Sequence, residues 1–286
     1  YATMVSYAGF ALIAPDYIGY GESNTTYHPY LLKNASAQSS LDMLKASMKF
    51  MNDQNILLNN QLYISGYSQG GHGALALAEE VINNFSDSVA LKAVAPMAAP
   101  LNLKDFTDTT FNAGYMPVPA FMAHIAEAYA TYNDNLTLEE MIDSNKTASF
   151  TNLFNKTNSS TAIHLQLGLA PGATVTSLFD STFVSDYISS SNHKLKTIFT
   201  ANNVDSLKTD IPIHLIHCTN DPIINIQFSK NGQSNLEQAG STNVKFTEID
   251  DRIPAYDINA SLVHQECASP AYSTAIKYFD SIRQGE

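Results

Sequence analysis

The sequence is poor in charged residues, in cysteine and in long apolar runs. Charged residues make up 15% of its 286 residues, against roughly 25% in a typical soluble domain. Basic residues are the scarcer sign, so the formal net charge is −12 and the pI is about 5.0. No basic patch is visible, which argues against a nucleic-acid partner and disfavours anionic ligands. No apolar run approaches the ~20 residues of a membrane-spanning helix, and no leader stands at the start, so we expect a soluble protein without an integral membrane segment.

Short apolar runs, each bounded by Gly, Pro or Asp, alternate with helical patterns along much of the chain. Runs of this kind are typical of buried parallel strands, and the helical segments carry apolar residues at intervals of three and four. The expected strands lie at 9–16, 61–66, 89–100, 211–218 and 243–250, and the expected helices at 39–52, 73–84 and 269–282. Strand and helix in alternation predict an α/β fold with a doubly wound, mainly parallel sheet.

The middle of the chain breaks this alternation. Residues 101–209 contain helical pieces and polar connectors without a strand pattern, which predicts a mostly helical cap or lid inserted into the sheet domain. The sheet domain would then comprise 1–100 and 210–286. The apolar run at 115–125 favours an apolar ligand, although the same residues must also pack the cap.

Both ends of the chain carry helix signals. Residues 1–10 resemble the end of a helix stopped by Gly9, so we expect the chain to start inside a domain. In the closing helix at 269–282, we expect Ser269 to be the N-cap and Pro270 to occupy the first helical position.

The stretch "GYSQG" at 66–70 places Ser68 between two glycines, directly after an expected strand and before an expected helix. A Gly-x-Ser-x-Gly segment in this context indicates a sharp turn that exposes a nucleophilic hydroxyl. Gly66 and Gly70 would supply room for the turn, and the backbone N–H of Gln69 could stabilise an oxyanion. A tight turn without chemistry is the alternative interpretation.

A nucleophilic serine needs a histidine to take its proton and a carboxylate to orient that histidine, in the chain order Ser, Asp or Glu, His. Asp221 follows the strand at 211–218, and Asp250 is the second candidate for the acid. His264 lies after the last strand and just before the last helix, which makes it the candidate base. A solvated loop histidine is the alternative interpretation of His264.

The remaining histidines fit the role of base less well by their place in the chain order or on the expected elements. They are His28, His72, His124, His164, His193, His214 and His217. No pair of them has a convincing metal-ligand spacing, so we expect no metal and no cofactor.

The two cysteines flank the candidate acid and base. Cys218 precedes Asp221 by three residues, and Cys267 follows His264 by three. If Asp221 and His264 meet, the thiols come close as well, and a disulfide would imply an oxidising compartment. Two separate buried thiols are the alternative.

Several stretches resemble the α/β-hydrolase superfamily, in particular its secreted lipase and esterase branch. They are "GFALIAPDYIGYGES" with "HPYL", "GYSQGGHGALA", "IPIHLIHCTNDPIIN" and "HQECASPAYSTAIKYF". The resemblance covers roughly residues 1–100 and 205–286. It implies that Ser68, Asp221 and His264 are nucleophile, acid and base. The family has further strands before 9–16, and its second oxyanion donor comes from a loop among them. Those strands are missing here, so we expect an upstream segment or a separate N-terminal chain.

We therefore expect a serine carboxylic ester hydrolase, an esterase or lipase that acts through an acyl-enzyme. Its substrate would be a small-molecule, lipid or polysaccharide ester, and its location secreted or periplasmic. A serine peptidase on the same fold and a catalytically silent binding protein are the rival hypotheses.

Overall fold

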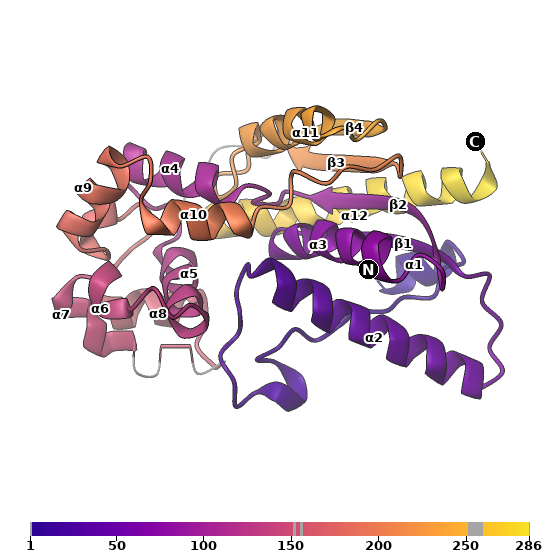
Figure 1. The fold of residues 1–286 in the computed structure, drawn as a ribbon, viewed down its shortest axis with the longest axis horizontal. Helices are drawn as coiled ribbons and strands as arrows, with labels where there is room; N and C mark the ends of the chain where they lie inside the picture. The colour runs from indigo at the N-terminus through magenta and orange to yellow at the C-terminus, as the bar shows by residue number, and fades with distance from the viewer. Residues whose placement is uncertain (1, 151–152, 155–156, 251–259, 286) are drawn as a thin grey trace. The chain divides into compact units, whose positions relative to one another are not determined.

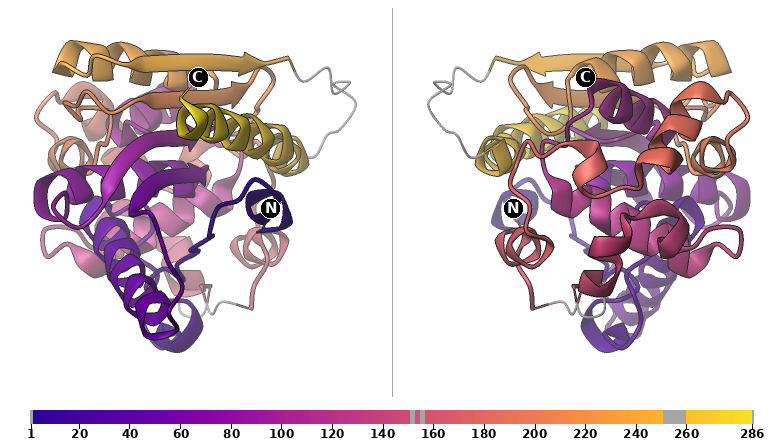
Figure 2. Two further views of the ribbon diagram at one scale, coloured as in Figure 1. Left: turned by 90° about the vertical axis from the view of Figure 1, so that its right-hand side faces the viewer. Right: turned by 90° about the vertical axis from the view of Figure 1, so that its left-hand side faces the viewer.

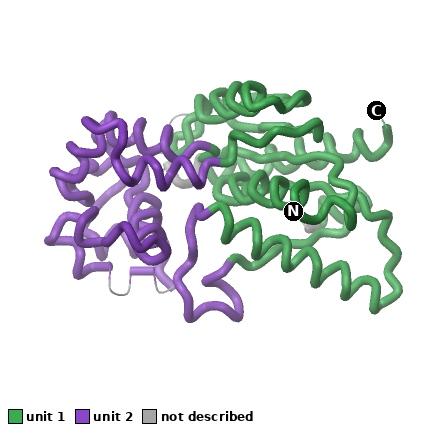
Figure 3. Tube along the Cα trace, in the orientation of Figure 1, with its two compact units in different colours: residues 1–17, 33–101, 204–286 green, residues 18–32, 102–203 purple. Residues whose placement is uncertain are grey.

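A computed structural model describes residues 2–150, 153–154, 157–250 and 260–285 (Figure 1). The chain divides into two compact units (Figure 3). Unit 1 consists of residues 1–17, 33–101 and 204–286, and unit 2 of residues 18–32 and 102–203. No helix in the described part of the chain is long and apolar enough to span a membrane.

Unit 1 is built on a sheet of four parallel strands in the order β1-β2-β3-β4. The strands are β1 (Gln61–Tyr67), β2 (Ala90–Met97), β3 (Ile213–Cys218) and β4 (Val244–Ile249). The helices are α1 (Ala2–Tyr7), α2 (Lys33–Asp53), α3 (Gln69–Asn84), α11 (Gln227–Ala239) and α12 (Ala260–Gln284). The predicted α/β fold with a parallel sheet is confirmed.

Alternating side chains of the strands form two cores, one on each face of the sheet. Val94 and Leu215 pack with buried residues of α2, α3 and α11 on one face. On the other face, Ala93 and Ala95 pack with Ala271 and other buried residues of α12. Figure 2 shows α12 crossing the sheet on the face opposite α2 and α3. Small residues on both sides of this contact let α12 approach the sheet closely.

The strand predicted at 9–16 is wrong, because these residues form neither strand nor helix in the structure. Their side chains nevertheless pack as a strand's would, on both faces of the sheet. The ring of Phe10 lies edge-on to Tyr63, with centroids 5.2 Å apart, while Ile13 packs into the core of the opposite face. A strand needs a hydrogen-bonded neighbour, and among the described residues β1 is the edge of the sheet. The predicted helix stop at Gly9 is confirmed, since α1 ends at Tyr7 and Gly9 has a φ of 78°.

The prediction for the closing helix is wrong at its start. The helix α12 begins at Ala260, so Ser269 is not its N-cap and Pro270 lies inside it. A proline there removes one backbone hydrogen bond. The helix continues because Ala271, Ala275 and Phe279 are buried beyond the proline, and this burial outweighs the lost bond. As a consequence, His264 lies in a helix and not in a loop.

Unit 2 is mostly helical. Its helices are α4 (Leu103–Ala113), α5 (Pro119–Tyr132), α6 (Leu138–Met141), α7 (Ser144–Thr147), α8 (Ser160–Leu167), α9 (Ser181–Ser189) and α10 (Lys194–Ala201), with short 3₁₀ helices at Gly21–Ser23, Ala148–Phe150 and Val175–Ser177. Two tyrosines of α5 hold residues 18–32 in this unit: the hydroxyl of Tyr129 donates to the carbonyl of Leu31 (3.1 Å), and that of Tyr132 to the carbonyl of Tyr27 (2.5 Å). Most apolar residues of 115–125, such as Met122 and Ile125, are buried in the interior of unit 2.

Candidate active site

Ser68 occupies the turn between β1 and α3. Its backbone has φ 56° and ψ −121°, a region that residues with a side chain rarely adopt and that costs about 1–3 kcal/mol. The N–H of Ser68 donates to the carbonyl of Met97 at the end of β2 (2.8 Å), and its own carbonyl accepts the N–H of Gly71 (2.9 Å). Hydrogen bonds on both sides therefore hold the serine in a strained conformation, as the Gly-x-Ser-x-Gly context predicts.

Two glycines near Ser68 are required by space, and only Gly66 is among the two predicted. A Cβ on Gly66 would lie 2.0 Å from the carbonyl oxygen of Gly70, so no side chain fits at 66. A Cβ on Gly70 would have nothing within 4 Å, and the prediction that Gly70 supplies room is wrong. The second tight position is Gly71, where a Cβ would lie 2.6 Å from that of Ala99. The turn thus needs glycine at position 66, where its backbone folds back on itself, and at position 71, where α3 passes the end of β2.

The helix α3 begins at Gln69, immediately after the serine. The N–H groups in the first turn of a helix have no carbonyl acceptor within that helix, and the helix dipole is positive at this end. The backbone at Gln69 therefore offers a favourable electrostatic environment for negative charge that develops beside the Ser68 side chain.

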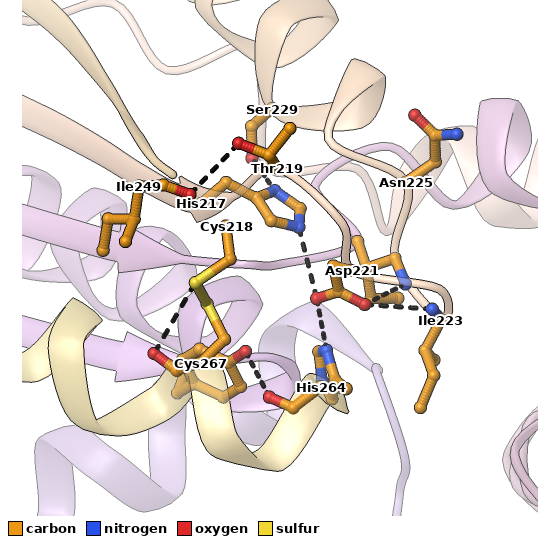
Figure 4. A network of polar contacts seen from close by, with 12 residues as sticks. His217, Cys218, Thr219, Asp221, Ile223, Asn225, Ser229, Ile249, His264 and Cys267 are labelled. Atoms are coloured by element: carbon orange, nitrogen blue, oxygen red, sulfur yellow. Dashed lines mark hydrogen bonds and ion pairs between the residues drawn. A yellow bond between two sulfur atoms is a disulfide. The ribbon is translucent and has the colours of Figure 1, made fainter. Parts of the chain in front are cut away.

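Asp221 follows β3 and is buried, with 6% of its surface exposed. Its Oδ1 accepts the backbone N–H groups of Ile223 (2.9 Å) and Ile224 (3.0 Å). Its Oδ2 lies 2.5 Å from Nδ1 of His264 and 3.3 Å from Nε2 of His217. Figure 4 shows the carboxylate between the two imidazole rings. Three hydrogen bonds and the approach of His217 thus surround this side chain and favour one orientation.

The environment of Asp221 favours its ionised form. Burial by itself raises the pKa of the carboxyl, but the hydrogen bonds from His217 and His264 outweigh burial and hold the pKa well below its usual range. Asp221 is therefore a carboxylate at neutral pH, and it can only accept hydrogen bonds.

The lowered pKa of Asp221 makes stability depend on pH. A carboxyl whose pKa is lower in the folded protein than in the unfolded chain, where it is about 3.9, stabilises the fold above that pH, and this contribution is lost as the pH falls further. We expect the free energy of unfolding in urea to decrease on acidification below about pH 4, and to decrease less steeply in the variant Asp221→Asn. Equal dependence on pH in the two proteins would contradict this assignment.

His264 lies near the start of α12 and is buried, with 5% of its surface exposed. Its Nδ1 faces Asp221, while its Nε2 is buried and has no hydrogen-bond partner among the described residues. The hydroxyl of Tyr67 donates to the backbone carbonyl of His264 (2.6 Å), and the two rings lie 5.0 Å apart. Because Tyr67 directly precedes Ser68, this contact ties the helix that carries His264 to the turn that carries the serine.

The predicted disulfide is present, and it joins the end of β3 to α12. Cys218 is bonded to Cys267, which lies 49 residues further along the chain. Cys267 follows His264 on the same helix, so the bond links the strand that leads to Asp221 with the helix that carries His264 (Figure 4).

Removal of this disulfide should lower both stability and activity. In the chain-entropy model a bridge that closes 49 residues contributes about 4 kcal/mol to the free energy of unfolding. We expect the double variant Cys218→Ala/Cys267→Ala to lose up to that amount in urea unfolding and to have a lower kcat. Treatment of the unchanged protein with reductant should reproduce the loss, and unaltered unfolding in both experiments would contradict the expectation.

The other candidates for acid and base lie elsewhere or bind other groups. Asp250 is exposed at the end of β4, and the acid that contacts His264 is Asp221. His214 bonds the hydroxyl of Thr247 (2.7 Å), and His164 accepts the N–H of Ala120 (3.1 Å). His28 bonds the carbonyl of Ile18, His193 caps α10, His124 stacks on Tyr30, and His72 is buried within α3.

One residue of this site, His217, was missed by the sequence analysis, which placed it on the strand and gave it no role. The signal was its spacing of four residues from Asp221, which becomes informative only when the chain is known to turn back after β3. The described residues contain no group of three or more His, Cys, Asp or Glu side chains that could hold a metal ion.

Comparisons with known structures support the fold. The rice cell wall degrading esterase LipA from Xanthomonas oryzae is 23% identical and has a TM-score of 0.78, with 94% of this chain and 70% of LipA covered. A protein of Legionella pneumophila named as a hydrolase is 21% identical, with a TM-score of 0.84 over 99% of this chain and 74% of its own. Lipase A of Candida antarctica is 16% identical, with a TM-score of 0.57 over 77% and 49%. At these identities each likeness shows a shared fold, that of α/β-hydrolases.

The sequence itself matches a protein family. No curated protein matches the chain, but the family model described as "Secretory lipase" matches residues 3–258. This match spans the Ser68 turn and the Asp221 loop. The chain therefore belongs to the secretory lipase family and is a lipase or esterase hydrolase with the α/β-hydrolase fold.

Proposed function

We propose that this protein is a serine carboxylic ester hydrolase that works through an acyl-enzyme, with Ser68 as nucleophile, His264 as base and Asp221 as the acid that orients the base. The observation that carries this proposal is the short contact between Asp221 and Nδ1 of His264, which leaves Nε2 of that histidine buried and without a hydrogen-bond partner among the described residues. A nitrogen in this state is suited to accept the proton of a serine hydroxyl.

The reaction follows from these roles. Ser68 Oγ attacks the ester carbonyl while Nε2 of His264 takes the hydroxyl proton. The carboxylate of Asp221 stabilises the imidazolium that forms. The N–H of Gln69, at the positive end of α3, stabilises the oxyanion of the tetrahedral intermediate. His264 returns the proton to the leaving alcohol, and water then repeats the sequence to release the acid.

Several features support secretion. The family is one of secretory lipases, and the bond between Cys218 and Cys267 is of a kind that persists in oxidising compartments. We therefore place the protein outside the cytoplasm, where its substrates would be small-molecule, lipid or polysaccharide esters.

Substrate panels separate this proposal from its rivals. The panel contains p-nitrophenyl esters of increasing acyl length and peptide p-nitroanilides. We expect the protein to hydrolyse the esters and not the anilides. Because LipA is named for the degradation of rice cell walls, acylated cell-wall polysaccharides belong in the panel beside triglycerides. Activity on anilides alone would identify a peptidase, and inactivity on every substrate would favour a silent binding protein.

A further inference from the structure

The proposed active site contains a second histidine on the far side of its acid. His217 is the penultimate residue of β3, and none of its surface is exposed. Its Nε2 lies 3.3 Å from Oδ2 of Asp221, the same oxygen that His264 contacts from the other side at 2.5 Å. Figure 4 shows the row of Ser229, His217, Asp221 and His264.

The partner of the other ring nitrogen decides which proton His217 carries. Its Nδ1 lies 2.8 Å from the hydroxyl oxygen of Ser229 on α11, and Ser229 is also buried. An ionised carboxylate accepts hydrogen bonds and donates none, so the nitrogen that faces Asp221 must carry a proton. In the neutral ring Nδ1 is then an acceptor, and the hydroxyl of Ser229 donates to it. Ser229 therefore selects the tautomer that presents N–H to the acid.

We propose that His217, held by Ser229, is a positioning residue for the hydrolase: it keeps Asp221 ionised and turned toward His264. This inference rests on the proposed function of Ser68, Asp221 and His264. His217 acts through Asp221 and is buried behind it, so it influences the base without being a base itself. Positioning of this kind resembles the outer contacts that orient metal-bound histidines, whose loss typically costs about 10–100-fold in activity.

Among the described residues, Glu248 on β4 is a further charged neighbour of His217. Glu248 is paired with His217 in the register of β3 and β4. It is exposed, and its carboxylate contacts Lys230 of α11 (3.1 Å) and accepts a hydrogen bond from the hydroxyl of Thr219 (3.2 Å). From α12 the titratable group at the acid is His264. Among the described residues, we therefore consider the charges of Asp221, His264, Glu248 and Lys230.

Removal of the donor should change the pH profile as well as the rate. Without the N–H of His217, the carboxylate of Asp221 interacts more strongly with the imidazolium of His264. The acid limb of kcat/KM then moves to higher pH. The rate falls because the carboxylate is held by one fewer contact. This loss should appear in kcat more than in KM, because His217 does not touch the substrate.

The test compares four variants of the full chain with the unchanged protein. His217→Leu removes the donor. His217→Gln restores one, because its amide nitrogen is as many bonds from Cβ as Nε2 of histidine. Ser229→Ala removes the group that selects the tautomer. His214→Leu is the matched control, since it deletes a buried histidine of the same strand that bonds Thr247 and not Asp221.

Three measurements are made on each variant and on the unchanged protein. They are the rate of ester hydrolysis as a function of pH, thermal unfolding, and the downfield proton NMR signal of the bond between His264 and Asp221. We expect His217→Leu to lower kcat/KM by about tenfold or more, to move the acid limb to higher pH and to shift the NMR signal. Ser229→Ala should cause the same three changes to a smaller extent. We expect His217→Gln to have nearly the kcat/KM, pH profile and NMR signal of the unchanged protein, and His214→Leu to keep its acid limb and NMR signal.

Distinct outcomes would overturn the two proposals. A folded His217→Leu with an unchanged pH limb and an unchanged NMR signal overturns the role of His217 alone. If His217→Leu does not fold, Ser229→Ala replaces it in the test. An unchanged pH limb and an unchanged NMR signal in Ser229→Ala then overturn the role of His217. Inactivity of the unchanged protein on all esters would instead overturn the proposed function, and the positioning role with it.

Discussion

Replacement of Ser68 with alanine is expected to reduce kcat for ester hydrolysis by about 10⁴-fold or more, since removal of the nucleophile in serine hydrolases leaves only the rate supplied by binding and oxyanion contacts. Among the described residues, the backbone N–H and carbonyl of residue 68 make the hydrogen bonds that hold it in place, and neither depends on the hydroxyl. Circular dichroism and thermal unfolding of Ser68→Ala should therefore match those of the unchanged protein.

The companion variant Ser68→Gly separates catalysis from strain. With φ at 56° and ψ at −121°, residue 68 has a conformation that glycine adopts without the Cβ penalty. We expect Ser68→Gly to be as inactive as Ser68→Ala but more stable, by about 1 kcal/mol. A loss of folded structure in both variants would show that Ser68 is a structural residue and would contradict the assignment.

Replacement of Gly66 with alanine is expected to have the largest effect on stability. The added Cβ would lie 2.0 Å from the carbonyl oxygen of Gly70 and 2.2 Å from its carbonyl carbon. Both atoms belong to the backbone of the turn, so relief of the clash requires the Ser68 turn to move. We expect a loss of more than about 4 kcal/mol in the free energy of unfolding, a range reached only by severe clashes and cavities.

Gly70→Ala is the matched control for this prediction. It adds the same methyl group four residues further on, at a position in α3 with nothing within 4 Å of the new Cβ. Alanine favours a helix over glycine by up to about 1 kcal/mol, so this variant should be at least as stable as the unchanged protein. Similar urea midpoints for the two variants would contradict the geometry of the turn.

The elements that sequence analysis predicted well are those determined by local pattern. The strand at 61–66 and the helix after Ser68 were predictable because apolar runs and helical spacing stand on either side of a motif with a known turn. The proximity of Asp221 and His264 was predictable because a nucleophilic serine needs an acid and then a histidine later in the chain, and these two residues stand in that order. The disulfide was in turn predictable from that proximity, because each cysteine lies three residues from one of the two.

The elements that sequence analysis missed are determined by partners distant in the sequence. Residues 9–16 have the pattern of a strand, but pairing depends on a neighbour that no local pattern supplies. The helix α12 runs through Pro270 because burial against the sheet outweighs a local stop signal. Gly71 depends on Ala99 in the same way, and His217 became significant only when the turn after β3 brought Asp221 back to it.

Labelling with a fluorophosphonate tests most directly the claim that Ser68 is the nucleophile. The reagent phosphonylates an activated serine, and intact mass followed by peptide mapping locates the adduct. We predict one adduct per chain, on Ser68, that is abolished in Ser68→Ala and slowed in Asp221→Asn. No adduct on the folded protein, or an adduct on another serine, would contradict the assignment.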